Sequence, residues 1–328
     1  MRSIGSSLLA ASLFASAAYA QTAPAPSPAT IPATAATAES APPPAERPVP
    51  DRRLLLNNLL VLRSNPLGLE DQIRFGYQMR LYRNDKPLFR DNFFFAGIYP
   101  RVNPAFIKFG PSVEVQPLSI LNLRFGLEYV DFFSTFGYLQ SFNSPLVNYS
   151  DTVLNAREDQ GLNYATEGMH FMFEPTVQMK FGPIAIRDKL AAEYWNMKVH
   201  AGDKVFYDAT LDTLVPANGW VLTNDLDVLY LTKFRLTVGA RYSVVHPFYR
   251  ASDYQPGEDA SSNPNGHQRL GALVAYTFFD TGWGGFNKPT LLAILSWYLE
   301  HRWRTGADTS QAYPYFVLGF AFQSDLLQ

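Results

Sequence analysis

The feature that most constrains this chain is a two-residue alternation of apolar with polar side chains, which recurs from Asp51 almost to the C-terminus. Within 72–82 the odd positions are Ile, Phe, Tyr, Met and Leu, and the even positions through 80 are Gln, Arg, Gly, Gln and Arg. Successive side chains of a β-strand point to opposite faces, so this segment predicts a strand with one apolar face and one polar face. The same alternation is clear at 107–116, 121–129, 171–181, 234–243 and 315–323.

Weaker alternation elsewhere raises the predicted number of strands to twelve, with further strands at 53–63, 88–99, 184–208, 219–231, 267–280 and 289–303. Each segment is long enough to cross a bilayer, which takes roughly 9 to 11 tilted residues per strand. The connections alternate between short turns and longer loops, the longer ones being 137–165, 246–266 and 304–311. An even number of strands with long loops at one end is typical of transmembrane barrels. We therefore predict an all-β fold, a twelve-stranded antiparallel transmembrane β-barrel over residues 51–328.

Composition removes several classes of function. The 328 residues contain no cysteine, which excludes disulfides, thiolate metal sites and a cysteine nucleophile. The formal net charge of −2 argues against a nucleic-acid partner, because such proteins usually present a basic face. Beyond the first twenty residues no uncharged apolar run reaches the eighteen or so positions of a transmembrane helix. If this chain lies in a membrane, it crosses the membrane as strands.

The N-terminal fifty residues have a different character from the rest. Residues 1–20 contain Arg2, an apolar run and the ending Ala18-Tyr19-Ala20, which predict a cleaved secretory signal peptide; a buried N-terminal helix is the alternative. Residues 21–50 contain nine Pro and nine Ala and no aromatic residue. Such a composition predicts a disordered periplasmic tether, because it offers too little apolar area to offset the entropy of ordering. The tether acts as a spacer or, alternatively, binds other envelope proteins.

Over residues 51–322 the chain resembles the outer-membrane β-barrel proteins of Gram-negative bacteria. The last predicted strand, Tyr315 to Phe322, ends on an aromatic residue and is similar to the C-terminal assembly signal of that class, although Gln323 to Gln328 follow it. The resemblance implies an outer-membrane location with both termini in the periplasm. It also implies three partners: outer-membrane lipid, lipopolysaccharide and the barrel-assembly machinery. A soluble periplasmic β-sandwich is the alternative fold, since its strands also alternate with period two.

In a barrel whose apolar rows face lipid, the opposite rows face the interior, and here they carry charges of both signs. Twelve strands enclose more space than an eight-stranded barrel and less than a general porin. One interpretation is a structural ladder of ion pairs in a nearly closed barrel, because unpaired buried charges are costly. The other is a narrow porin-like passage for small polar or anionic solutes. The groups expected to line the lumen are Arg124, Glu128, Glu174, Asp225, Asp227, Arg235 and Arg241.

Passive solute transport is the function we favour, without a catalytic site, metal or cofactor. A non-conducting scaffold that binds envelope partners is one alternative, and an outer-membrane lipid hydrolase is another. None of the five histidines has a serine two residues away, as a catalytic pair on one strand face requires. Ser243 and His246 are three residues apart, so in an unbroken strand we expect them to point to opposite faces.

Overall fold

The structure, a computed structural model, describes residues 50–281, 284–305 and 314–327. The predicted signal peptide and the tether, except for Pro50, therefore lie outside the described residues. Most of the predicted loop 304–311 does so as well.

Twelve antiparallel strands close into one barrel, as the sequence predicts. Closure is made by β1, which pairs with β2 on one side and with β17 on the other. Two of the twelve are interrupted strands, formed by β3 with β4 and by β5 with β6. In chain order the wall consists of β1 (Arg52–Ser64), β2 (Gly68–Met79), β3 (Phe93–Ile98) with β4 (Arg101–Asn103), β5 (Phe106–Phe109) with β6 (Pro111–Leu118), β7 (Leu121–Phe133), β9 (Ala165–Phe181), β10 (Ile184–Met197), β13 (Asn218–Leu231), β14 (Leu236–Pro247), β15 (His267–Thr277), β16 (Asn287–Glu300) and β17 (Tyr315–Asp325).

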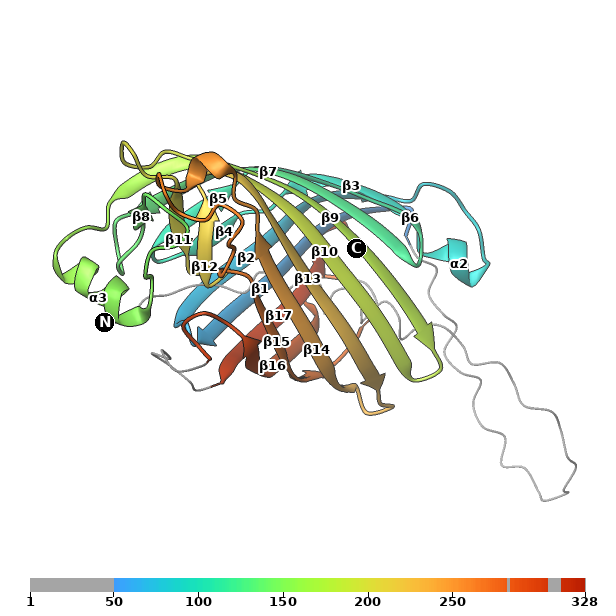
Figure 1. Cartoon of the computed structure of the whole chain (residues 1–328). Coiled ribbons are helices and arrows are strands. Elements are labelled where there is room, and N and C mark those ends of the chain that lie inside the picture. The colour runs from blue at the N-terminus through green and yellow to red at the C-terminus, as the bar shows by residue number, and fades with distance from the viewer. Residues whose placement is uncertain (1–49, 282–283, 306–313, 328) are drawn as a thin grey trace, which may run out of the picture.

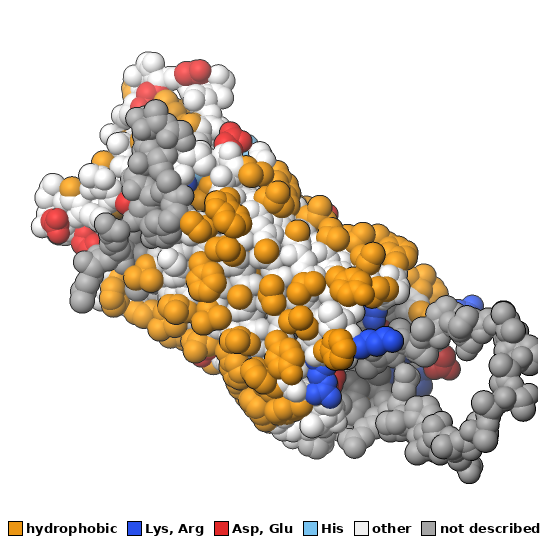
Figure 2. All heavy atoms as spheres, turned by 90° about the horizontal axis from the view of Figure 1, so that it is seen from below, with side chains coloured by type: hydrophobic (Ala, Val, Ile, Leu, Met, Phe, Trp, Pro, Cys, Tyr) orange, Lys and Arg blue, Asp and Glu red, His pale blue; other side chains and the backbone are white. Residues whose placement is uncertain are grey.

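The alternation in sequence becomes an outer and an inner surface of this wall. In β7 the outward side chains Phe125, Leu127 and Tyr129 are 40, 46 and 42% exposed, whereas the inward Arg124 and Glu128 are buried. Hydrophobic side chains spread over the side of the barrel, with charged groups gathered toward its two ends (Figure 2). A closed ladder leaves no unpaired edge strand, which is the condition for a β-structure to lie in lipid.

The two ends of the barrel differ. At the terminal end, where β1 begins and β17 finishes, 182–183 and 232–235 form short turns, and the connection 80–92 carries the short helix α2 (Pro87–Arg90). At the opposite loop end lie the connections 134–164, 198–217 and 248–266, with α3 (Asp151–Asp159) and η2 (Ala251–Asp253). The loop end also has two short turns, so its connections are more varied than the sequence predicts. No helix among the described residues is long and apolar enough to span a membrane.

Two predicted strand ranges need correction. The strand predicted at 184–208 is wrong beyond Met197, because the chain turns at Gly202 with φ of 93° and re-enters the barrel as β11 (Val205–Asp208). There β11 pairs with β12 (Thr213–Pro216) and with β8 (Ser141–Phe142) in a separate three-stranded sheet. The strand predicted at 88–99 starts only at Phe93, because Pro87 begins α2.

Candidate functional site: the barrel interior

A hairpin from the loop end packs inside the barrel, in the part of the interior that lies toward the loop end. This plug, residues 203–217, contains β11 and β12, which lie within the ring of strands beside β8 (Figure 1). Every residue of β11 and β12 is buried, without the alternation seen in the wall. Phe206 packs against Trp195 of β10 with 5.6 Å between ring centroids, and both side chains have 0% exposure. The plug is therefore part of a packed core and not a loop lying over the opening.

Polar side chains of the wall hold the tip of the plug by its backbone. Arg63 of β1 donates hydrogen bonds to the carbonyls of Ala209 and Thr210, at 3.0 and 3.3 Å. His267 Nε2 donates to the carbonyl of Leu211 at 2.7 Å, and His301 Nε2 donates to that of Asp212 at 2.9 Å. These bonds satisfy carbonyl groups that the hairpin turn leaves without partners, which a buried turn requires.

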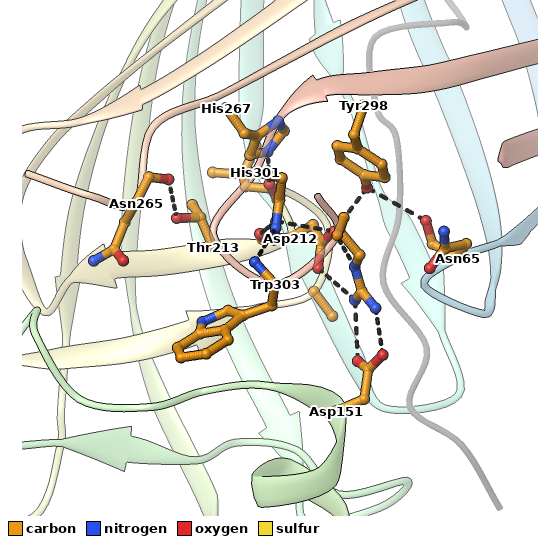
Figure 3. A network of polar contacts seen from close by, with 12 residues as sticks. Asn65, Asp151, Asp212, Thr213, Asn265, His267, Tyr298, His301 and Trp303 are labelled. Atoms are coloured by element: carbon orange, nitrogen blue, oxygen red, sulfur yellow. Dashed lines mark hydrogen bonds and ion pairs between the residues drawn. The ribbon is translucent and has the colours of Figure 1, made fainter. Parts of the chain in front are cut away.

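The strongest attachment surrounds the Asp212 carboxylate (Figure 3). Arg304 donates to its two oxygens at 3.1 and 3.0 Å, and Tyr298 donates its hydroxyl at 2.7 Å. Arg304 also pairs with Asp151 at the start of α3, so one guanidinium joins the plug to a second loop. Burial alone raises the pKa of Asp212, but the charges of Arg304 and His301 outweigh that effect and hold the pKa well below the usual range. The carboxylate is therefore ionised at neutral pH.

An ion-pair layer lies next to the plug, on the inner face of the neighbouring strands β4, β5, β7, β9 and β10. It comprises Arg101, Lys108, Glu128, His170 and Glu193, all less than 9% exposed. His170 contacts Glu128 at 2.8 Å through Nδ1 and Glu193 at 3.0 Å through Nε2, and Arg101 pairs with Glu128. Lys108 lies 3.9 Å from Asp208 of the plug. The bonds within the layer thus connect β4, β7, β9 and β10, and Lys108 of β5 faces the plug beside them.

Six of the seven residues predicted to line the lumen lie buried on the inner face, and five of them form two ion-paired groups. Arg124 donates to Glu174 at 2.8 Å, and Lys189 approaches the same carboxylate at 2.9 Å. On the other side, Arg241 bridges two carboxylates, Asp225 at 3.0 Å and Asp227 at 2.7 Å. The sixth is Glu128 of the ion-pair layer.

Arg235 is the exception. It lies exposed in the turn before β14 with φ of 61°, and it donates to the carbonyl of Phe278 at 2.8 Å. The alternation predicted a strand from residue 234, whereas β14 begins at Leu236. Among the residues that sequence reasoning missed are Arg63, His301 and Arg304, whose plug contacts come from distant segments and leave no local pattern. Residues 205–208 were predicted only as the end of the wall strand at 184–208.

A cavity occupies the interior toward the terminal end. This vestibule has a volume of about 140 Å³ and reaches from Arg124 and Glu174 in the wall to the segment 90–92 at the terminal end. Leu55 and Leu59 of β1 and Ala321 of β17 supply an apolar side, and Arg74, Glu114 and Arg187 supply charges. Glu114 holds Arg74 by two hydrogen bonds of 2.7 and 2.9 Å. The interior thus has three levels: vestibule, ion-pair layer and plug.

The histidines and serines of the described segments do not form hydrogen-bonded pairs. Ser243 faces inward and donates to Asp225 at 2.5 Å, whereas His246 faces outward on the same strand. Their opposite orientation confirms the expectation from their spacing. Within the described residues no group of three or more His, Asp or Glu side chains is arranged to hold a metal ion.

A closed antiparallel sheet with an apolar exterior and a charged interior defines this chain as a transmembrane β-barrel of the outer-membrane type. No family model matches the chain, and no curated protein matches it.

Several solved structures are similar at low identity. OccAB1 of Acinetobacter baumannii is 13% identical, with 80% of this chain and 60% of that chain covered and a TM-score of 0.37. The translocator domain of the autotransporter NalP from Neisseria meningitidis is 11% identical, with coverages of 86 and 90% and a TM-score of 0.39. The toluene transporter TodX of P. putida is 9% identical, with coverages of 85 and 91% and a TM-score of 0.34. The chain spans 60% of the length of OccAB1, and at these scores the likenesses carry no argument about activity.

Proposed function

We propose that this protein is an outer-membrane passage for small polar solutes, and that the plug closes it in the described conformation. The terminal end then faces the periplasm and the loop end faces the outside, as in barrels whose longer loops are extracellular. In this orientation the vestibule opens to the periplasm. Outer-membrane lipid, lipopolysaccharide and the barrel-assembly machinery remain the partners we propose.

The observation that carries this proposal is that the interior holds a cavity toward the terminal end and a plug toward the loop end. A polar vestibule of about 140 Å³ lies in line with a plug that belongs to a single loop, 198–217. The wall ladder does not include the plug, because β10 pairs directly with β13 along Ile184–Asn196. The barrel can therefore stay closed as a sheet while the hairpin leaves, which is the geometry a gate requires.

The test is the conductance of a variant that lacks the plug. Residues 203–217 are replaced by a short Gly-Ser linker, and the purified variant and wild type are compared in planar bilayers. We expect steady conductance from the variant, and either silence or rare brief openings from wild type. Heat-modifiable gel mobility and β-type circular dichroism establish that the variant is folded. A folded variant that remains silent would overturn the proposal.

A non-conducting envelope scaffold is the second candidate, and the ion-pair layer favours it. Four of its buried side chains, Arg101, Glu128, His170 and Glu193, are bonded to one another, and these bonds do not involve the plug. This candidate predicts that both proteins in the conductance experiment stay silent. The lipid-hydrolase alternative stays an untested prediction.

A further inference from the structure

In the bonds that hold the tip of the plug, the plug accepts and the wall donates. The acceptors are the backbone carbonyls of residues 209–212 and the carboxylate of Asp212. The donors, which we call the cradle, are Arg63, His267, Tyr298, His301 and Arg304. The backbone N–H groups of Thr210 and Leu211 donate instead to Asp208 within the plug, at 2.6 and 3.0 Å. The tip therefore turns a row of acceptors toward the cradle (Figure 3).

The cradle lies in one continuous sector of the wall. Its members come from β1, β15, β16 and the segment just after β16, and in the sheet only β17 separates β16 from β1. Toward the loop end, the inward side chains of these four strands include two arginines, Arg63 and Arg269, and no carboxylate. The four strands contain two acidic residues in all: Glu300 is exposed, and Asp325 pairs with Arg53 at the terminal end. Among the described residues, neither Arg63 nor Arg269 forms an ion pair.

The plug supplies a negative charge that this sector of the wall lacks. Arg304 adds a third guanidinium there, and it binds Asp151 as well as Asp212. Glu70 of the adjoining strand β2 accepts a bond from Gln72 and acts on the cations of the ion-pair layer. Among the described residues of this sector, three arginines therefore face two carboxylates while the plug is in place, and Asp151 alone when the plug has left. An excess of cations in a poorly hydrated interior stabilises a bound anion.

The groups that the cradle binds are those of a small acidic amide. Arg304 and the Tyr298 hydroxyl take the carboxylate, and such charge-assisted hydrogen bonds are strong. Two histidine N–H groups take the neighbouring carbonyls, at 2.7 and 2.9 Å. The orientation of His301 does not depend on the plug, because the backbone N–H of Trp303 donates to its Nδ1 at 3.0 Å. The cradle is therefore suited to a solute that offers a carboxylate with amide carbonyls beside it.

We propose that the cradle is the site at which the passage recognises its solute, and that this solute carries a carboxylate beside amide carbonyls, as short acidic peptides and N-acylated amino acids do. Asp212 occupies the site as an internal substitute, so the plug closes the passage by filling its recognition site. The inference rests on the proposed function, because it names the solute class of the same passage. Binding to the cradle requires no conduction, and it can be measured separately.

The test uses the full mature chain with Asp212→Asn, folded in detergent micelles, and isothermal titration calorimetry. The probe is N-acetylaspartate α-amide, which carries the chemical groups of residue 212, and N-acetylasparagine amide is the uncharged comparison compound. In wild type the tethered Asp212 competes with the probe at a high effective concentration. We expect the variant to bind the probe saturably, at least tenfold more tightly than it binds the comparison compound and at least tenfold more tightly than wild type binds the probe.

Three results would each overturn the proposal: equal affinity of the variant for the two compounds, equal affinity of the two proteins for the probe, or no saturable binding of the probe to the folded variant. Asp212→Ser has the same expected outcomes and is used if the asparagine variant does not fold. Hydrogen exchange in 203–217 should also rise with probe concentration in the variant, because the probe and the plug compete for one site. Probe binding that leaves this exchange unchanged would contradict the assignment.

Second substitutions in the Asp212→Asn chain locate the site. Tyr298→Phe removes one donor and no charge, and it should weaken probe binding about tenfold, as expected for a hydrogen bond to a charged group. Arg304→Gln should weaken it further. Arg74→Gln is the matched control, because Arg74 also lies on the inner face but lines the vestibule. Undiminished binding in folded Tyr298→Phe and Arg304→Gln chains would contradict the assignment to the cradle.

The cradle and the passage can fail separately. If the probe binds as expected while the plug-free barrel stays silent, the cradle is a binding site and the proposed passage is wrong. If the plug-free barrel conducts and the probe does not bind the folded variant, the passage stands and the assignment of the cradle is wrong.

Discussion

Replacing Arg304 by alanine tests whether the plug is held by ion pairs. The side chains of Arg304 and Asp212 are each 3% exposed and that of Asp151 is 13% exposed, so the substitution leaves two carboxylates in a poorly hydrated place. Breaking one partner of a buried ion pair costs about 3 to 5 kcal/mol. Since tenfold corresponds to about 1.4 kcal/mol, local opening of the plug should become roughly 10² to 10⁴ times more frequent.

Hydrogen exchange with mass spectrometry measures that opening, because peptides from 203–217 exchange separately from the wall. The expected result is faster exchange across the plug with unchanged protection in β14 and β15. Arg250→Ala is the control: the Arg250 side chain is 60% exposed and 3.9 Å from Asp253, and such a surface pair contributes about 0 to 1 kcal/mol. Plug exchange that changes less than tenfold in Arg304→Ala would refute the view that this guanidinium holds the plug.

Three further predictions concern the wall and pH. Asp188 lies exposed on the outer face of β10, where Asn224 donates to it at 2.6 Å, so Asp188→Leu should raise the free energy of unfolding by about 1 kcal/mol in lipid. A decrease in urea titrations would show that protein and not lipid covers this wall. Gly110→Ala should destabilise the barrel by about 1 to 3 kcal/mol, since its Cβ would lie 1.9 Å from a carbonyl oxygen of β7. Gly126→Ala, whose nearest contact is 3.6 Å, should be tolerated, and equal unfolding midpoints for the two variants would contradict this. The lowered pKa of Asp212 means that its stabilising contribution is complete above the unfolded value of 3.8 and is lost as pH falls below it. The midpoint temperature of thermal unfolding should therefore fall more steeply between pH 5 and 2 in wild type than in Asp212→Asn. Parallel curves for the two proteins would show that Asp212 does not cause the loss of stability in acid.

Much of the wall could be predicted because its signal is local. Inward and outward positions of β7 follow from the identity of alternate residues, and lipid outside with charge inside explains that pattern. The signal fails where the wall ends. Arg235 lies in a turn, although its polar side chain continues the alternation of the next strand. A turn of a few residues has no sequence period of its own, so the alternation could not mark where the strand begins. The polar pair Asp188 and Asn224 shows a second limit, since polar side chains also occur on the lipid face.

The candidate site was only partly accessible from sequence. Arg124 and Glu174 could be placed on the inner face, but their pairing depends on the register of β7 with β9, where they lie opposite each other. The plug was missed because a buried apolar hairpin and a wall strand have similar composition over four residues.

The order of the residues alone determined a chain of strands with one apolar and one polar face, which favours a barrel with lipid outside and charges inside. Tertiary structure decided whether the enclosed space is empty. Arg63, Asp212, His301 and Arg304 are brought together only when the barrel closes, and their partners lie as many as 153 positions apart along the chain. Contacts at that separation depend on strand register and loop path, which nearest-neighbour patterns do not contain.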